Sequence, residues 1–179
     1  TGAGTLFNPT TLTPTYLPAI GETGVIVFTI QANSTGSCAS VTDAMNLTIT
    51  PAPTVSAGGD AEICQGLPFN FATQAPLATA TNYLTIAWTS SGTGVLTNAN
   101  TLTPTYTPGV GEAGNVIFTL TATGNGSCVP IQDIMILTIT PSPVVNAGSD
   151  EEICENATFN FTAQAALATA SNYSSITWT

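Results

Sequence analysis

Residues 130–140 read PIQDIMILTIT, and residues 40–50, which lie 90 positions earlier, read SVTDAMNLTIT. In both stretches Met, Leu and Ile hold alternate positions, whereas the residues on either side of the Met differ. A set of apolar residues at every second position is typical of the buried face of a β-strand. This stretch therefore predicts a strand whose Met135, Leu137 and Ile139 face a hydrophobic core.

The same offset of 90 residues recurs along the rest of the chain. TLTPTY at residues 11–16 returns at 101–106, and GSC at 36–38 returns at 126–128. Roughly half of the aligned positions are identical, and no insertion interrupts the alignment. Self-similarity at a fixed period is the sequence signature of repeat proteins. We therefore expect tandem repeats about 90 residues long.

Two Pro-rich segments, at residues 50–53 and 140–143, suggest where one repeat ends and the next begins. On this phasing, residues 1–52 are the C-terminal part of one repeat, residues 53–142 are one complete repeat, and residues 143–179 are the N-terminal part of the next. We expect the chain to be a window on a longer array.

Each repeat contains seven or so short stretches with strand character, separated by Gly- and Pro-containing turns. The expected strands of the complete repeat cover residues 55–57, 69–71, 86–88, 101–106, 116–120 and 135–139. This number of strands, with a Trp on the third, indicates an all-β immunoglobulin-like sandwich. The expected core residues are Trp88, Tyr106, Phe118, Leu120, Leu137 and Ile139.

The charge composition excludes several functions. The chain has no Lys, Arg or His and ten carboxylates, which give a net charge of −10. Nucleic-acid binding and attraction to anionic membranes both depend on cationic side chains, so neither is expected. No apolar run approaches the roughly 20 residues of a membrane span. Without His or Lys there is no usual base to activate a nucleophile, so we expect no enzyme activity.

Four motifs together resemble a known family. They are Ala-Gly-x-Asp-x-x-Ile-Cys from residue 57, Asn-Tyr-x-x-Ile-x-Trp-Thr from residue 82, Leu-Thr-Pro-Thr-Tyr from residue 102 and Gly-Asn-Gly-Ser-Cys from residue 124. They are similar to the PKD-like and Ig-like repeats of Bacteroidetes surface proteins, which include giant gliding-motility adhesins of the SprB type. The resemblance implies export by the type IX secretion system and display at the cell surface, with no catalytic residue.

The four cysteines occur as two repeated pairs, Cys38 with Cys128 and Cys64 with Cys154. The absence of His and of Cys-x-x-Cys argues against zinc. Disulfides are expected, with reduced thiols as the alternative. Cys64 and Cys128 can pair within the complete repeat. However, the strand order places them near opposite poles, so each can instead pair with a cysteine of a neighbouring repeat. The sequence leaves both pairings open.

Acidic residues gather just after the two Pro-rich segments. The candidate calcium ligands are Asp60, Glu62, Asp150 and Glu152. Carboxylate oxygens at a joint between domains could hold Ca²⁺ and stiffen it. We favour solvated acidic turns instead, because no Asp-x-Asp loop is present, and we expect no other cofactor.

Two functions remain. The first is a structural stalk that projects an adhesive tip from the cell, whose partners are the neighbouring repeats of the same chain. In the second, the repeats themselves bind surface polysaccharide or other filament subunits many times over, which produces avidity. The sequence favours the stalk, because no exposed aromatic or charged cluster stands out.

Overall fold

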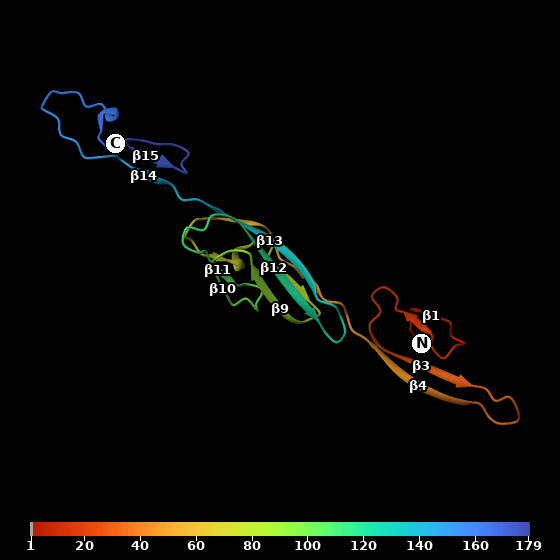
Figure 1. The fold of residues 1–179 in the computed structure, drawn as a ribbon. Coiled ribbons are helices and arrows are strands. Elements are labelled where there is room, and N and C mark those ends of the chain that lie inside the picture. Colours follow the sequence, from red (N-terminus) through yellow and green to blue (C-terminus); the bar gives the residue numbers. More distant parts are fainter. Residues whose placement is uncertain (1) are drawn as a thin grey trace.

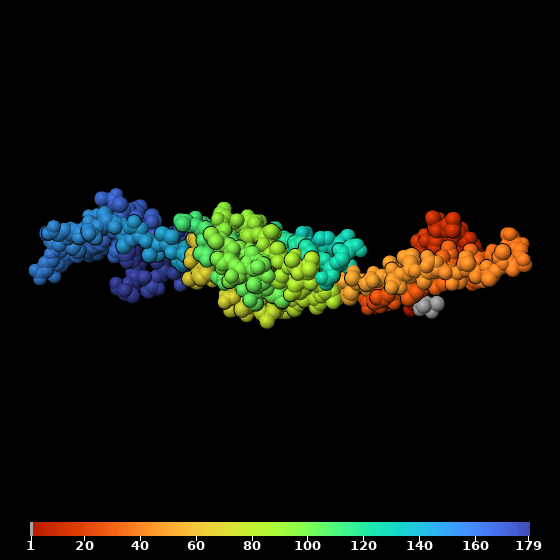
Figure 2. Space-filling model, turned by 90° about the horizontal axis from the view of Figure 1, so that it is seen from below, coloured from red at the N-terminus to blue at the C-terminus, as the bar shows by residue number. Residues whose placement is uncertain are grey.

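The computed structural model describes residues 2–179, which are all-β apart from two 3-10 helices of three residues each. The chain is drawn out into three parts that follow one another along a line (Figure 1; Figure 2). We call them the N-terminal part (residues 2–50), the middle unit (54–140) and the C-terminal part (144–179).

The middle unit contains most of the secondary structure. Its elements are β5 (Thr54–Ser56), β6 (Ala61–Cys64), β7 (Phe69–Asn70), η1 (Phe71–Thr73), β8 (Thr79–Thr81), β9 (Tyr83–Ser90), β10 (Val95–Thr97), β11 (Thr105–Thr107), β12 (Gly114–Gly124) and β13 (Ile131–Thr140). They form a four-stranded sheet in the order β6-β13-β12-β9, a three-stranded sheet in the order β10-β11-β7 and the pair β5-β8. β6 runs parallel to β13, whereas the other strand pairs are antiparallel.

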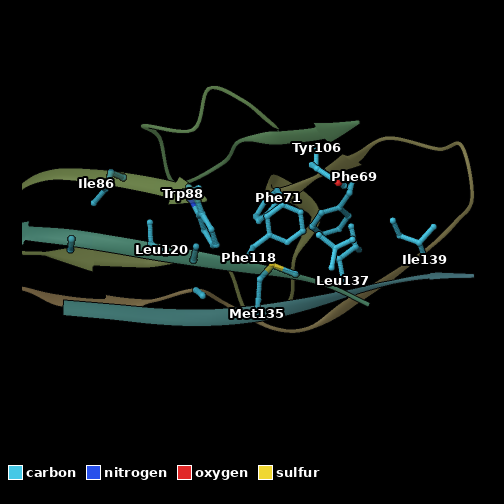
Figure 3. Packing of buried hydrophobic residues seen from close by; sticks show 14 residues of the cluster. Phe69, Phe71, Ile86, Trp88, Tyr106, Phe118, Leu120, Met135, Leu137 and Ile139 are labelled. Atoms are coloured by element: carbon cyan, nitrogen blue, oxygen red, sulfur yellow. The ribbon is translucent and has the colours of Figure 1, made fainter. Parts of the chain in front are cut away.

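One hydrophobic core lies between these sheets, an arrangement consistent with a β-sandwich (Figure 3). All six residues expected in the core lie in it, with exposed fractions between 0% and 3%: Trp88, Tyr106, Phe118, Leu120, Leu137 and Ile139. Phe71 stands at the centre, with its ring edge-on to those of Trp88 and Phe118 at centroid distances of 4.8 and 5.1 Å. Edge-to-face packing of this kind adds to the stabilisation from burial alone.

The two flanking parts contain strands and a 3-10 helix at positions 90 residues away from elements of the middle unit. The N-terminal part holds β1 (Thr5–Phe7), β2 (Thr15–Leu17), β3 (Gly24–Ala32) and β4 (Val41–Ile49), and the C-terminal part holds β14 (Val144–Asn146), η2 (Phe161–Ala163) and β15 (Thr169–Ser171). β1 to β4 occupy the positions of β10 to β13 shifted by 90 residues, and the β3–β4 register is that of β12–β13 with the same shift.

The expected strands differ from the observed ones in three ways. The strand expected over residues 101–106 was wrong over most of its length. The Thr101 N–H donates to the carbonyl of Asn98 in a turn, and the strand β11 begins only at Thr105. Three short strands, β6, β8 and β10, were not expected. The strand expected at residues 69–71 ends early, since the Asn70 side chain accepts from the Ala72 N–H and starts η1.

Candidate functional site at the joints

The joint between the N-terminal part and the middle unit is residues 50–53, Thr-Pro-Ala-Pro. Prolines at alternate positions restrict this segment to an extended course. Pro53 is buried, and the Asn82 side-chain amide donates to the carbonyl of Ala52 at 3.2 Å. Asn82 has a φ of 54°, a left-handed conformation that Asn tolerates better than most residues. The first joint is therefore fixed to the middle unit by this hydrogen bond and by the burial of Pro53.

The second joint, residues 140–143, repeats this contact. The Asn172 amide donates to the carbonyl of Ser142 at 3.2 Å, 90 residues after the equivalent bond at the first joint. On its other side, the middle unit also binds this joint. The Gln65 N–H donates to the carbonyl of Thr140 at 2.8 Å, and the Ser142 hydroxyl donates to the carbonyl of Gln65 at 3.3 Å. This joint is thus contacted from both sides.

The two cysteines of the middle unit lie at its joints. Cys128, in the loop between β12 and β13, has its Sγ 3.1 Å from Thr50 Oγ1 at the first joint. Cys64 ends β6 in register with Thr140 at the second joint. The ten residues of β13 separate the two cysteines, a distance of about 33 Å at roughly 3.3 Å per residue. This exceeds the ~7 Å between Cα atoms that a disulfide allows. A bond within the middle unit is therefore ruled out, and all four thiols of this chain are free.

A tyrosine–glutamate pair closes the β10–β11 hairpin. The Glu112 carboxylate accepts from the N–H groups of Thr93 and Gly109, both at 2.7 Å, and from the Tyr106 hydroxyl at 2.9 Å. Thr93 precedes β10 and Gly109 follows β11, so one carboxylate binds both chain segments at the open end of the hairpin. Partial desolvation opposes ionisation of Glu112, but these hydrogen bonds outweigh it and lower its pKa. Burial, followed by the bond to Glu112, raises the pKa of Tyr106.

The same pair recurs in the N-terminal part. Glu22 accepts from the N–H groups of Ala3 and Ala19 at 2.6 and 2.8 Å and from the Tyr16 hydroxyl at 2.8 Å. Neither glutamate was predicted to have a structural role. A signal was available, because a Glu six residues after the Tyr of TLTPTY is present in both copies.

Two aspartates secure the point where the chain passes from β5 to β6. Asp133, on β13, accepts from the Ala57 N–H at 2.8 Å, and Asp60 accepts from the Ile136 N–H of β13 at 2.8 Å. Between these strands the backbone has left one sheet and has not yet joined the other, so the carboxylates replace missing ladder bonds. Asp60, a calcium candidate, is thus engaged in holding the fold.

The other calcium candidates do not form a binding cluster. Glu62, Asp150 and Glu152 are all exposed. Within residues 2–179, no group of three or more His, Cys, Asp or Glu side chains could hold a metal ion.

A groove on the N-terminal part is lined by side chains of β1 to β4, among them Leu6, Tyr16, Phe28 and Met45. The residues 90 positions later belong to the core of the middle unit or pack against it. There, β5 to β9 and η1 complete the unit. The groove therefore corresponds to a core surface, and its shape does not indicate a small-molecule site.

No protein family, curated protein or solved structure matches this chain. Neither of the helices within residues 2–179 has the length and hydropathy required to cross a membrane.

Proposed function

We propose that the chain is a section of a tandem array of immunoglobulin-like β-sandwich repeats that forms the non-catalytic stalk of a surface adhesin. The observation that carries the proposal is the repeated joint. Asn82 and Asn172 make the same hydrogen bond to the joint before them, at the same distance of 3.2 Å. A joint built the same way each time produces a regular, extended array, which is what a stalk requires.

The extended course of the chain also supports a stalk. A ten-residue β13 spans about 33 Å, and three extended joint residues add about 10 Å, so each repeat advances the array by about 40 Å. With the joint held by hydrogen bonds on both sides, this advance is kept from one repeat to the next. The resemblance to gliding-motility adhesins extends the proposal to an extracellular location at the cell surface and to export by the type IX system.

Small-angle X-ray scattering of the 179-residue chain tests the stalk. A compact globule of this length has a radius of gyration of about 16 Å. A straight rod of three parts, each about 40 Å long, has one of about 35 Å. We expect a value near that of the rod and a scattering profile with a rod-like region. A value near that of the globule contradicts the stalk.

A glycan array and immobilised surface polysaccharides test the alternative, in which the repeats are multivalent binding modules. We expect no saturable binding. Saturable binding that increases with the number of repeats would replace the stalk by the binding module.

A further inference from the structure

The starting observation is that Cys128 reaches across the first joint. Its Sγ lies 3.1 Å from Thr50 Oγ1 and 3.7 Å from the carbonyl oxygens of Thr50 and Pro51. Thr50 directly follows β4, the last strand of the N-terminal part. A thiol of the middle unit therefore rests against the end of the last strand of the part before it.

The second cysteine occupies the complementary place at the other joint. Cys64 is the Cα partner of Thr140 in the parallel β6–β13 ladder. The Thr140 hydroxyl donates to the carbonyl of Ile63, the residue just before Cys64, at 3.1 Å. Thr140 is the counterpart of Thr50, 90 residues later. The threonine that Cys128 contacts at the first joint is thus the counterpart of the threonine that Cys64 pairs with at the second joint.

The two joints are equivalent positions 90 residues apart, so the neighbours of Thr140 predict the neighbours of Thr50 in a longer array. On this basis, the cysteine equivalent to Cys64 in the preceding unit lies beside Thr50, as Cys128 does. A cysteine placed like Cys64 in the preceding unit is a strand neighbour of Thr50, and paired strands lie about 4.8 Å apart. Cys128 already contacts the hydroxyl of that threonine. Disulfides require Cα atoms roughly 4.4–6.8 Å apart. Strand pairing on the one hand and the thiol–hydroxyl contact on the other therefore bring both cysteine positions to the same threonine.

We propose that, in an array continuing with the 90-residue period, the Cys64 position of each unit forms a disulfide with the Cys128 position of the next unit. This inter-unit disulfide rests on the tandem array of the proposed function. It joins the end of β6 to the β12–β13 loop of the following unit and bridges the Pro-rich joint covalently. Each unit carries both cysteines, so every joint within the array is bridged once.

Both thiols are accessible to an oxidant, since Cys64 is exposed and Cys128 is partly exposed. The thiolate of one cysteine attacks a sulfur of oxidised glutathione and releases one reduced glutathione. The thiolate of the second cysteine then displaces the other glutathione from the mixed disulfide. The two cysteines lose two electrons and two protons in total, which two molecules of reduced glutathione carry away.

Under this pairing, the partners of Cys64 and of Cys128 both lie outside the 179-residue sequence. The test therefore attaches a copy of residues 90–179 after residue 179, which continues the 90-residue period. The copied Cys128 then lies in the unit that follows the unit of Cys64. Both chains are equilibrated in a glutathione redox buffer, alkylated and weighed intact. We expect four alkylated thiols in the 179-residue chain. In the extended chain, which has six cysteines, we expect four alkylated thiols and one disulfide.

Two variants of the extended chain identify the bond. Changing the copied Cys128 to Ser is expected to abolish the disulfide, whereas Cys128→Ser at the original position leaves it intact. Because the chain has no Lys or Arg, trypsin cannot cut it, and a glutamate-specific protease is used instead; the linked peptides begin after Glu62 and after the copied Glu112. A disulfide in the 179-residue chain, or one lost only with the original Cys128, overturns the proposal.

Scattering from the same extended chain separates this inference from the proposed function. A rod-like profile with no disulfide refutes the inter-unit bond and leaves the stalk standing. A compact profile refutes the stalk, whatever the state of the thiols.

Discussion

Replacing the carboxylate of Glu112 by an amide tests how the β10–β11 hairpin is held. In Glu112→Gln, one oxygen becomes an NH₂ group that faces either the Thr93 N–H or the Gly109 N–H, so one of these two donors loses its acceptor. A hydrogen bond to a charged group contributes about 1.5–3 kcal/mol. We expect the free energy of unfolding of the middle unit to fall by about 2 kcal/mol, which lowers Tm by about 10 °C for a domain of this size.

The effect should depend on pH in a defined direction. The folded state lowers the pKa of Glu112 below its ordinary value of 4.5, so its carboxylate stabilises the fold above that pH. This contribution is lost as the pH falls through the folded-state pKa, because protonated Glu112, like Gln, keeps only one carbonyl oxygen as a full acceptor for the two N–H groups. The difference in stability between the wild type and Glu112→Gln should therefore be full at pH 7 and shrink progressively below pH 4.5.

Urea unfolding followed by tryptophan fluorescence measures this difference. Trp88 is 3% exposed and reports on the middle unit, whereas Trp178 is 57% exposed, so all variants carry Trp178→Phe. Glu62→Gln is the matched control, because Glu62 is exposed and its replacement should change stability by no more than about 0.5 kcal/mol. A Glu112→Gln deficit that persists undiminished at low pH would refute the role of the charged hydrogen bonds.

Two further substitutions probe the core and the hairpin. Phe118→Ala removes a fully buried ring and should destabilise the middle unit by about 3–5 kcal/mol in the same urea assay, whereas Phe28→Ala, the counterpart in the N-terminal part, should leave the Trp88 transition unchanged. Gly92→Ala places a Cβ against the Tyr106 hydroxyl and should lower the Tm of the middle unit by several degrees. Gly36→Ala, whose new Cβ meets no atom within 4 Å, should not change that Tm. Equal Trp88 midpoints for Phe118→Ala and the parent, or for Gly92→Ala and Gly36→Ala, would contradict these accounts.

The long strands were predictable because their pattern is local. Alternate residues of β12 and β13 are buried, and this alternation is written in consecutive letters of the sequence. The short strands were not predictable for the opposite reason. β6 has only four residues, too few for alternation to stand out, and it exists because β13 offers a partner 76 residues further along the chain.

Some features of the joints were also predictable from the sequence, and others were not. Their prolines and their 90-residue spacing are visible in the sequence, and so is the recurrence of the cysteines. The contact between Cys128 and Thr50 joins residues 78 positions apart, and no local pattern indicates it. The pairing of the cysteines therefore stays open at the level of the sequence, whereas the register of β6 with β13 places Cys64 and Cys128 at opposite ends of the unit.

The amino-acid sequence alone indicated the all-β class, the 90-residue period and six of the core residues, because each depends on side-chain chemistry repeated at short, regular intervals. The Tyr106–Glu112 pair, the crossing held by Asp60 and Asp133 and the position of each thiol depend on which strands become neighbours. That choice is made when distant segments bury their apolar faces together. Polar groups that become buried in this way need hydrogen-bond partners, and only the folded chain brings those partners close enough.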